Sequence, residues 1–273
     1  MWTLLDTLSP RSVTIQLSMQ TVQSPSISDQ LRQRFDTAKN VLVLTGAGVS
    51  AESGVPTFRG GGNTAVWKGM PFDVISSARM VKRDLPAVWE WFDYRRTLRQ
   101  PLKPNPAHRE IARWEKRFQQ FTLVTQNIDG LHQKAGSTGV IELHGNIWRA
   151  RCVECDARYE ILASESHPEQ CVSCGNSLRP DVVLFGEMLP LGAFELAAEG
   201  AQQCELCIVV GTSGIVYPAA SLPEIAKAAG AYLCEVNPER TALSGVFDEV
   251  LTGMAGEVLP MIASAPDSTN TRS

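Results

Sequence analysis

The sequence lacks the features that would place the protein in a membrane or in a secreted class. No stretch approaches the roughly 18 consecutive apolar residues of a membrane span. The first twenty residues contain no basic segment followed by an apolar one, so we expect no secretory signal and a cytoplasmic protein. Internal repeats and low-complexity tracts are also missing. We therefore expect no membrane among the partners of this chain.

The chain also lacks an excess of charge of one sign. Its formal net charge is -4 over 273 residues, with 25 basic and 29 acidic side chains. Direct binding of nucleic acid through bulk charge is therefore not expected, although a local basic groove would not show in this sum. Hydrophobic residues make up 44% and charged residues 20%, which is typical of a globular protein. The length suffices for a large domain with a smaller one inserted.

Short apolar runs alternate with helix-like segments along most of the chain. This alternation is typical of a Rossmann-like α/β fold, in which a parallel sheet carries helices on both faces. The predicted strands are Val41–Leu44, Phe121–Thr125, Val140–Leu143, Cys207–Val210 and Tyr232–Val236, and the predicted helices include Gln30–Ala38 and Leu222–Ala229.

Two segments interrupt the alternation, and we interpret them as insertions that pack together into a small domain beside the sheet. Residues 61–119 are rich in helix signals, among them Asn105 as a cap before Pro106. The segment of residues 149–180 is short and polar, and it contains cysteines. The remaining chain divides into a flexible N-terminal extension, a Rossmann-like domain in three pieces and a flexible tail, namely residues 1–28, then 29–60, 120–148 and 181–264, and finally 265–273.

Four cysteines form two pairs with the spacing of a metal site. Cys152 and Cys155 make one C-x2-C pair, Cys171 and Cys174 make another, and fifteen residues separate the pairs. This pattern is typical of one structural Zn²⁺ held by four thiolates, with no vacancy for water. Metal binding can supply the folding free energy that a segment of about thirty residues cannot obtain from its few apolar side chains. Two disulfides are the alternative, and a reducing cytosol disfavours them.

A third C-x2-C pair has different surroundings. Cys207, the second member after Cys204, runs directly into the apolar residues 208–210, where a thiol behaves as a small hydrophobe. Cys234 is likewise embedded in a predicted strand. We expect none of these three cysteines to bind metal.

A glycine-rich turn follows the first predicted strand. Residues 46–51 read Gly-Ala-Gly-Val-Ser-Ala and fit the G-x-G-x-x-G/A pattern of dinucleotide-binding folds. A strand precedes the turn and a helix can follow it, so backbone N–H groups can approach a pyrophosphate there. A tight turn without a ligand is the alternative. No acidic strand-end residue stands about twenty positions further on to hold a ribose, so this is not a standard dehydrogenase fingerprint.

Several motifs taken together resemble the sirtuin family. The resemblance spans about Leu31 to Ile262, and it implies an NAD-dependent protein lysine deacylase that consumes NAD and releases nicotinamide and O-acyl-ADP-ribose. The implied partners are the acylated lysine side chains of proteins. The motifs are Glu-Ser-Gly-Val-Pro-Thr-Phe-Arg-Gly at 52–60, Gln-Asn-Ile-Asp-Gly-Leu-His at 126–132, His144-Gly145, Gly211-Thr212-Ser213 and the two cysteine pairs of the zinc pattern.

The resemblance also implies roles for single residues. His144, at the end of a predicted strand, matches the catalytic base of the family, and an imidazole pKa of about 6.5 suits proton abstraction near neutrality. Asn127 and Asp129 would position the nicotinamide carboxamide and the ribose. Without the resemblance, His144 is equally a packing residue, and Asn127 and Asp129 are helix caps. The other implied NAD contacts are Gly46, Ala47, Gly48, Glu52, Thr57, Phe58, Arg59, Gln126, Ile128, Gly211, Thr212, Ser213, Asn237 and Ala255.

Residues 182–187 resemble the segment on which sirtuins receive the acyl-lysine peptide as an added strand, and without the resemblance they are one more core strand. The implied contacts are Val182, Leu184, Phe185, Gly186 and Glu187.

The acyl preference depends on residues 92–95. They match a Tyr-x-x-Arg pair that serves malonyl and succinyl groups in one branch of the family. Arg95 is present, but Phe92 lacks the hydroxyl, and losing a hydrogen bond to a charged group costs about 1.5–3 kcal/mol. We expect deacetylation to be retained and desuccinylation to be weakened.

Other functions stay open at the level of sequence. Protein ADP-ribosyl transfer would use the same NAD contacts and differ only in the acceptor. A dehydrogenase and a zinc-containing NAD-binding scaffold without catalysis are more distant alternatives. The oligomeric state is not encoded in any motif, and a monomer is the expectation.

Overall fold

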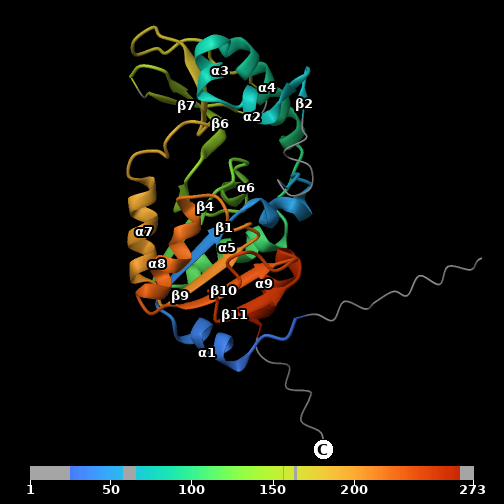
Figure 1. The fold of residues 1–273 in the computed structure, drawn as a ribbon, viewed down its shortest axis with the longest axis vertical. Coiled ribbons are helices and arrows are strands. Elements are labelled where there is room, and N and C mark those ends of the chain that lie inside the picture. The colour runs from blue at the N-terminus through green and yellow to red at the C-terminus, as the bar shows by residue number, and fades with distance from the viewer. Residues whose placement is uncertain (1–24, 58–65, 156, 163–164, 265–273) are drawn as a thin grey trace, which may run out of the picture.

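The computed structural model describes residues 25–57, 66–155, 157–162 and 165–264. Its centre is a six-stranded sheet with the order β11-β10-β9-β1-β4-β5 (Figure 1). Every pairing in this sheet is parallel, so the predicted Rossmann-like α/β fold is confirmed. The strands are β1 (Asn40–Thr45), β4 (Gln120–Thr125), β5 (Val140–Glu142), β9 (Leu206–Val210), β10 (Tyr232–Asn237) and β11 (Glu249–Thr252).

The strands form because continuous apolar runs can be buried on both faces of a parallel sheet. All residues of β9 and β10 are buried, as are the last five of β1. The sequence did not predict β11, which has only two apolar residues, Val250 and Leu251, between Glu249 and Thr252 and lies at the edge of the sheet.

The strand order reverses direction at the centre of the sheet. From β1 the chain proceeds outward through β4 and β5, and it then returns to β9 and proceeds outward on the other side through β10 and β11. The connections from β1 to β4 and from β9 to β10 therefore run over opposite faces of the sheet. In open parallel sheets such a switch point leaves a crevice at the carboxyl ends of the strands, where ligands bind.

Two layers of helices cover the sheet. On one face α1 (Asp29–Thr37), α5 (Pro106–Arg117) and α9 (Ala255–Ala263) bury an apolar cluster that includes Leu31 and Trp114. On the other face lie α7 (Ala193–Gln203) and α8 (Leu222–Ala228). Within the described residues, no helix combines the length and the apolar character that crossing a membrane would need.

The position of α5 corrects one predicted boundary. The sequence places residues 61–119 in the small domain, but Ala107, Ile111 and Trp114 of α5 pack in the core of the large sheet. The apolar face of a helix does not reveal which core it joins, and α5 contacts α9 and β4. Residues 106–117 therefore belong with the sheet, while the rest of the predicted division stays a prediction.

A smaller unit lies at the end of the molecule opposite α1 (Figure 1). A three-stranded antiparallel sheet in the order β7-β6-β8 packs against its longest helix, α4. Its elements are β2 (Val66–Trp67), β3 (Met70–Pro71), α2 (Phe72–Ile75), α3 (Ala78–Arg83), α4 (Leu85–Arg99), β6 (Gly145–Cys152), β7 (Arg158–Glu160) and β8 (Leu178–Val182). Short connecting helices are η1 (Ala47–Ser53), α6 (Leu131–Lys134) and η4 (Ala219–Ser221).

Candidate active site

The glycine loop packs directly against the loop that follows β9. Gly46 N donates to Val210 O at 3.0 Å, and Gly48 N donates to Gly211 O at 2.8 Å. A Cβ atom at Gly48 would lie 2.6 Å from Gly211 Cα, so no larger residue fits. Where the sequence predicts a helix after the turn, the structure has the 3₁₀ helix η1, which begins within the turn at Ala47 and ends at Ser53. These glycines therefore join the two loops at the switch point, and the N–H groups of Gly46 and Gly48 are already used within the protein.

The predicted NAD contacts gather around this crevice from several strands. Thr212 is the centre of one group, because Gln126 Nε2 donates to its Oγ1 at 3.0 Å and Asn237 Nδ2 donates to its carbonyl oxygen at 2.7 Å. Glu52 Oε2 accepts from the N–H of Gly256 at 2.6 Å, which ties η1 to the first turn of α9. The structure thus brings β1, β4, β9, β10 and α9 together at one edge.

The remaining predicted contacts differ in position. Ala255 is buried as the first residue of α9, and Ala47 and Ser213 lie partly exposed in the two crevice loops. Thr57 is the last described residue of its loop, and Ile128 packs against the apolar cluster of the small unit. Phe58 and Arg59 lie outside the described residues.

Asn127 is fixed in one orientation by its amide group. Its Nδ2 donates to Gly46 O at 3.0 Å and to Ser50 Oγ at 3.2 Å. Its main-chain N–H donates to Thr125 Oγ1 at 3.1 Å. No described residue donates to the side-chain oxygen of Asn127, which leaves that oxygen to accept a bond from a ligand.

Asp129 is a buried carboxylate, 4% exposed. One of its oxygens accepts from Leu131 N at 2.9 Å, and its main-chain carbonyl accepts from Trp148 Nε1 at 2.8 Å. Its charge acts on two basic neighbours: burial lowers the pKa values of His108 and Arg99, and the Asp129 carboxylate opposes this change in both. The site therefore contains a negative charge in a poorly solvated place.

His144 lies between β5 and β6, at the carboxyl edge of the large sheet. Its Nδ1 is 2.8 Å from the main-chain oxygen of Gln126. Because a carbonyl oxygen can only accept, Nδ1 carries the proton and Nε2 keeps a free lone pair. Burial lowers the pKa of His144 from 6.5, against the opposing effect of the bond to Gln126. The imidazole is therefore neutral at neutral pH and able to take a proton.

A buried polar cluster behind Asn127 was missed at the level of sequence. Ser50 Oγ lies 3.2 Å from His108 Nε2, and His108 Nδ1 lies 3.0 Å from Asn105 Oδ1. Burial lowers the pKa of His108 to about 4. The helix cap at Asn105 was the feature of the sequence that could have indicated this cluster. Asn105 before Pro106 places His108 in the first turn of α5, where it faces η1. His108 was given no role in the sequence analysis.

His132 continues the same cluster. Its Nε2 lies 3.0 Å from Thr45 Oγ1, which also contacts Thr125 Oγ1 at 2.9 Å. The rings of His132 and His108 meet edge to face with centroids 4.9 Å apart. Burial lowers the pKa of His132 to about 3, with His108 adding to the effect. Two neutral histidines thus support the loops that carry Asn127 and Asp129.

Residues 182–187, here called the peptide-receiving segment, run beside the start of α3. Phe185 forms a parallel bridge with Ser77, in which Phe185 N donates to Ser76 O at 2.9 Å and Ala78 N donates to Phe185 O at 3.0 Å. Val182 and Leu184 are buried, whereas Phe185 is 52% exposed. The side chains of Val182 and Leu184 face the core, so a peptide would meet this segment through main-chain groups, although those of Leu184 itself are bonded to Glu187.

Arg95 of α4 is surrounded by aromatic rings. Its guanidinium carbon lies 5.4–5.6 Å from the ring centres of Phe72, Trp91 and Phe92. Burial lowers the pKa of Arg95 to about 9, and the positive charge of Arg99 acts in the same direction. No described carboxylate pairs with Arg95, and Phe92 is 1% exposed. Helix α4 therefore carries a poorly solvated cation next to the ring of Phe92, which has no hydroxyl.

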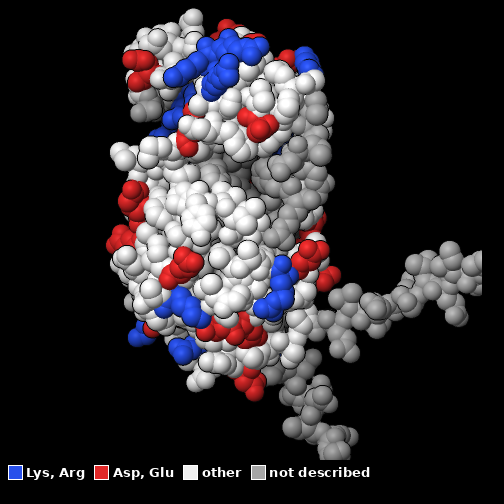
Figure 2. Space-filling model, viewed as in Figure 1, with Lys and Arg blue, Asp and Glu red and all other residues white. Residues whose placement is uncertain are grey.

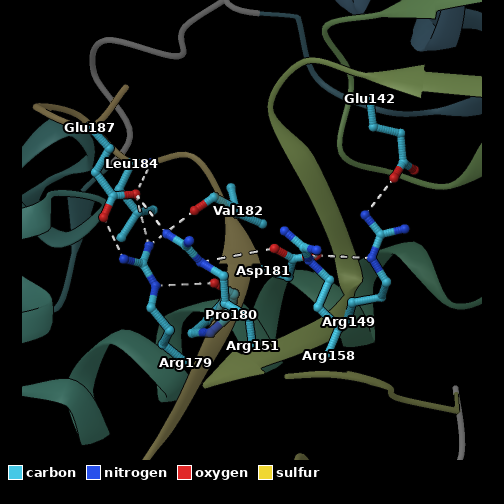
Figure 3. A network of polar contacts seen from close by, with 10 residues as sticks. All are labelled: Glu142, Arg149, Arg151, Arg158, Arg179, Pro180, Asp181, Val182, Leu184 and Glu187. Atoms are coloured by element: carbon cyan, nitrogen blue, oxygen red, sulfur yellow. Dashed lines mark hydrogen bonds and ion pairs between the residues drawn. The ribbon is translucent and has the colours of Figure 1, made fainter. Parts of the chain in front are cut away.

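An ionic network connects β5 and β6, the strands on either side of His144, with β8 and the peptide-receiving segment (Figure 3). Arg149 donates to Glu142 at 2.5 Å and to Asp181 at 3.0 Å, so it ties β6 to the end of β5 and to β8. Arg158 reaches the same Asp181 at 3.4 Å. At the other end, both nitrogens of the Arg179 fork bond to Glu187, whose Oε2 also accepts from Leu184 N at 2.9 Å. Glu187 is thus held by Arg179 and shapes its own loop.

The four cysteines predicted to bind zinc converge. Their sulfur atoms all lie within 4.8 Å of one another, and the closest pairs are 3.4–3.5 Å apart. Zn–S bonds of about 2.3 Å in a tetrahedron place sulfurs about 3.8 Å apart, so the cluster fits one Zn²⁺ and excludes disulfides. Cys204, Cys207 and Cys234 are free and buried in the core.

The chain is similar to proteins of known family. A model described as the Sir2 family matches residues 46–218. The chain is 48% identical over 211 residues to an NAD-dependent protein deacylase of Aquifex aeolicus (strain VF5), which covers 77% of this chain and 87% of the relative.

The chain is also similar to solved structures of Sir2 proteins. A Sir2 homologue in complex with NAD has a TM-score of 0.80 at 38% identity, covering 88% of this chain and 93% of the other. A Sir2 complex with a deacetylated peptide and 3′-O-acetyl ADP-ribose has a TM-score of 0.72 at 31% identity, covering 85% and 96% of the two chains.

Proposed function

The chain belongs to the Sir2 family, and from this membership we propose how its residues carry out NAD-dependent deacylation of protein lysines. The enzyme uses NAD to remove acyl groups from lysine side chains, and it releases nicotinamide and O-acyl-ADP-ribose. Protein ADP-ribosyl transfer is not favoured, because the relatives are named as deacylases. One structural Zn²⁺, held by the four cysteines, stabilises the small unit.

We assign the pyrophosphate of NAD to the glycine-lined crevice at the switch point. Glycine at position 48 allows the two crevice loops to pack against each other, because a Cβ atom there would lie 2.6 Å from Gly211 Cα. Thr212 and Ser213 supply hydroxyls beside it. Gln126 and Asn237, both bonded to Thr212, are suited to the ribose and adenosine portions.

Asn127 and Asp129 are assigned to the nicotinamide end. The bonds to Gly46 and Ser50 aim the free amide oxygen of Asn127 at a carboxamide donor. The buried carboxylate of Asp129 stabilises positive charge that develops on the ribose carbon when nicotinamide leaves, and such preorganised charges act strongly in a poorly solvated site. The acyl oxygen of the substrate lysine attacks that carbon.

His144 is assigned as the general base that removes a proton from a ribose hydroxyl. The observation that carries this role is the bond from Nδ1 to Gln126 O, which leaves Nε2 as a free acceptor at the sheet edge. A neutral imidazole with a lowered pKa is already in the form that accepts a proton.

The acylated peptide is assigned to the main chain of the peptide-receiving segment, where strand addition tolerates many sequences. The exposed ring of Phe185, held against Phe72 with centroids 5.7 Å apart, borders that position. Deacetylation is the main activity under this proposal. Arg95 attracts a carboxylated acyl group, but Phe92 supplies no second hydrogen bond, so desuccinylation and demalonylation are weaker.

The test is to incubate the purified enzyme with NAD and matched acetyl-, malonyl- and succinyl-lysine peptides while nicotinamide release is followed. We expect fastest release with the acetyl peptide, and succinyl turnover slower by about tenfold, as loss of one charged hydrogen bond implies. Equal or faster succinyl turnover would contradict the proposed preference, and absence of release with every peptide would contradict the residue assignments.

A further inference from the structure

A groove with free positive charges borders the peptide-receiving segment. We propose that this groove binds acidic side chains of the protein substrate, on one side of the acyl-lysine, and so sets a sequence preference. The inference rests on the proposed placement of the peptide along residues 182–187. It concerns the substrate class and does not involve the NAD crevice.

The basic groove has a volume of about 600 Å³ and lies between the end of α3 and the strands β6 and β8. Lys82, Arg83, Arg151 and Arg179 line it together with the acids Asp84 and Glu187. Figure 2 shows basic side chains gathered over α3 at this end of the molecule. Positive charge therefore exceeds negative charge on this lining, although the whole chain is net negative.

The acids of the groove are engaged, whereas its outer cations are not. Asp84 caps α4 by accepting from Ala87 N at 3.1 Å, and Glu187 is bonded to Arg179. Lys82 and Arg83 are exposed, and no described residue forms an ion pair or hydrogen bond with either side chain. The outer wall of the groove thus presents charge that is not neutralised inside the protein.

The arrangement of charge on α3 is not explained by helix stability. Arg79, Lys82 and Arg83 stand at positions i, i+3 and i+4, so the like charges share one face and repel. Cations in the last turn interact well with the helix dipole, but Arg79 lies in the first turn, where a positive charge is unfavourable. A face that is unfavourable for the helix is consistent with selection for an anionic partner.

The groove continues from the peptide-receiving segment. The bridge between Ser77 and Phe185 sets α3 directly beside this segment, and Glu187 belongs to both the segment and the groove lining. The six residues of α3 are about 9 Å long, which an extended peptide covers in about three residues. Acidic side chains about three to five positions from the acyl-lysine would reach Lys82 and Arg83.

The experiment compares acetyl-lysine peptides of one length that contain either alanines or two adjacent aspartates, moved along the peptide on both sides of the lysine. We expect aspartates on one side to lower KM by about threefold to tenfold with kcat unchanged. Because the charges lie at a solvated rim, this gain should disappear between about 50 mM and about 300 mM salt.

The double substitution Lys82→Gln with Arg83→Gln should abolish the preference and leave the kinetics of the alanine peptide unchanged. Arg113→Gln with Lys116→Gln is the matched control, because it removes two cations from the C-terminal half of α5 on the large sheet. That control should retain the full preference for aspartates.

Three results would overturn the inference: equal KM for aspartate and alanine peptides, a preference that survives the Lys82 and Arg83 substitutions, or a preference lost equally in the control. Nucleic-acid binding that depends on Lys82 and Arg83 without any peptide preference would overturn it as well. Failure of every peptide to release nicotinamide would instead contradict the proposed residue assignments, so the two failures are distinguishable.

Discussion

At the scale of single residues, the environment of His144 makes a prediction about pH. A base acts in its deprotonated form, and burial lowers the pKa of His144 below 6.5. The acid limb of kcat/KM should therefore fall at a pH below 6.5, with a flat region through neutrality. Initial rates between pH 5 and pH 8, taken with saturating NAD, measure this limb.

Replacing the same side chain separates catalysis from binding. His144→Ala should lower kcat by about 10² to 10⁴, the usual contribution of a general base, while the dissociation constant for NAD changes little. Calorimetry with NAD measures this dissociation constant. A variant that loses both properties together would show that His144 serves the shape of the crevice more than the proton transfer.

Phe92 gives a second prediction at this scale. Phe92→Tyr restores the hydroxyl beside Arg95 and should raise desuccinylation about tenfold or more relative to deacetylation, because a hydrogen bond to a charged group is worth about 1.5–3 kcal/mol. The ratio of kcat/KM for succinyl and acetyl peptides measures this gain. Arg95→Gln is the control and should reduce the succinyl rate further. An unchanged ratio in Phe92→Tyr would reject the explanation.

At the scale of elements, the cluster between η1, α5 and α6 contains two histidines that are neutral when buried. The pKa values of about 4 for His108 and about 3 for His132 lie below the ordinary value of 6.5. The unfolded chain consequently binds more protons than the folded one once the pH falls below 6.5. Stability contributed by the neutral forms is present above that pH and is lost as the pH falls.

The free energy of unfolding should therefore drop by about 4 kcal/mol between pH 7 and pH 5 from these two groups together. Urea unfolding at both pH values measures the drop. His108→Gln should remove about half of this drop in the free energy of unfolding. A drop of the same size in that variant would assign the pH dependence to other groups.

Some elements of the fold follow from local sequence patterns, and others do not. Helices α1 and α8 and five strands of the large sheet were predicted close to their observed bounds, because their apolar periodicity is local. The cap signal at Asn105 also predicted the start of α5. The same periodicity did not tell that α5 joins the large core, nor that His108 faces Ser50 across 58 positions of sequence. Those facts depend on which surfaces meet.

At the scale of the whole molecule, the small unit is connected to the large sheet through β6, β8 and the ionic network, and its own core is small. Only a few buried residues, among them Trp89, Ile161 and Leu178, support the cysteine-bearing region. Structural zinc contributes about 10–16 kcal/mol of binding free energy in small zinc domains, which exceeds what such a cluster supplies.

Cys155→Ser should therefore reduce the zinc content from one ion to none and unfold β7 with its flanking loops, while NAD binding to the large sheet is retained. Metal analysis, hydrogen exchange of the small unit and NAD calorimetry measure the three effects. Cys204→Ala, in the C-x2-C pair buried in the core, is the control and should keep the zinc. Zinc retained in Cys155→Ser would remove that residue from the ligand set.

The sequence by itself determined the parallel sheet, the zinc ligands and the glycine turn, because apolar period, cysteine spacing and turn residues act within a few positions of the chain. The tertiary structure alone decided the rest. It placed the switch point between β1 and β9, used the N–H groups of Gly46 and Gly48 to join two loops, and gave His144 its tautomer through Gln126. It also set α3 beside residues 182–187. These features arise from contacts between distant segments, which no local pattern encodes.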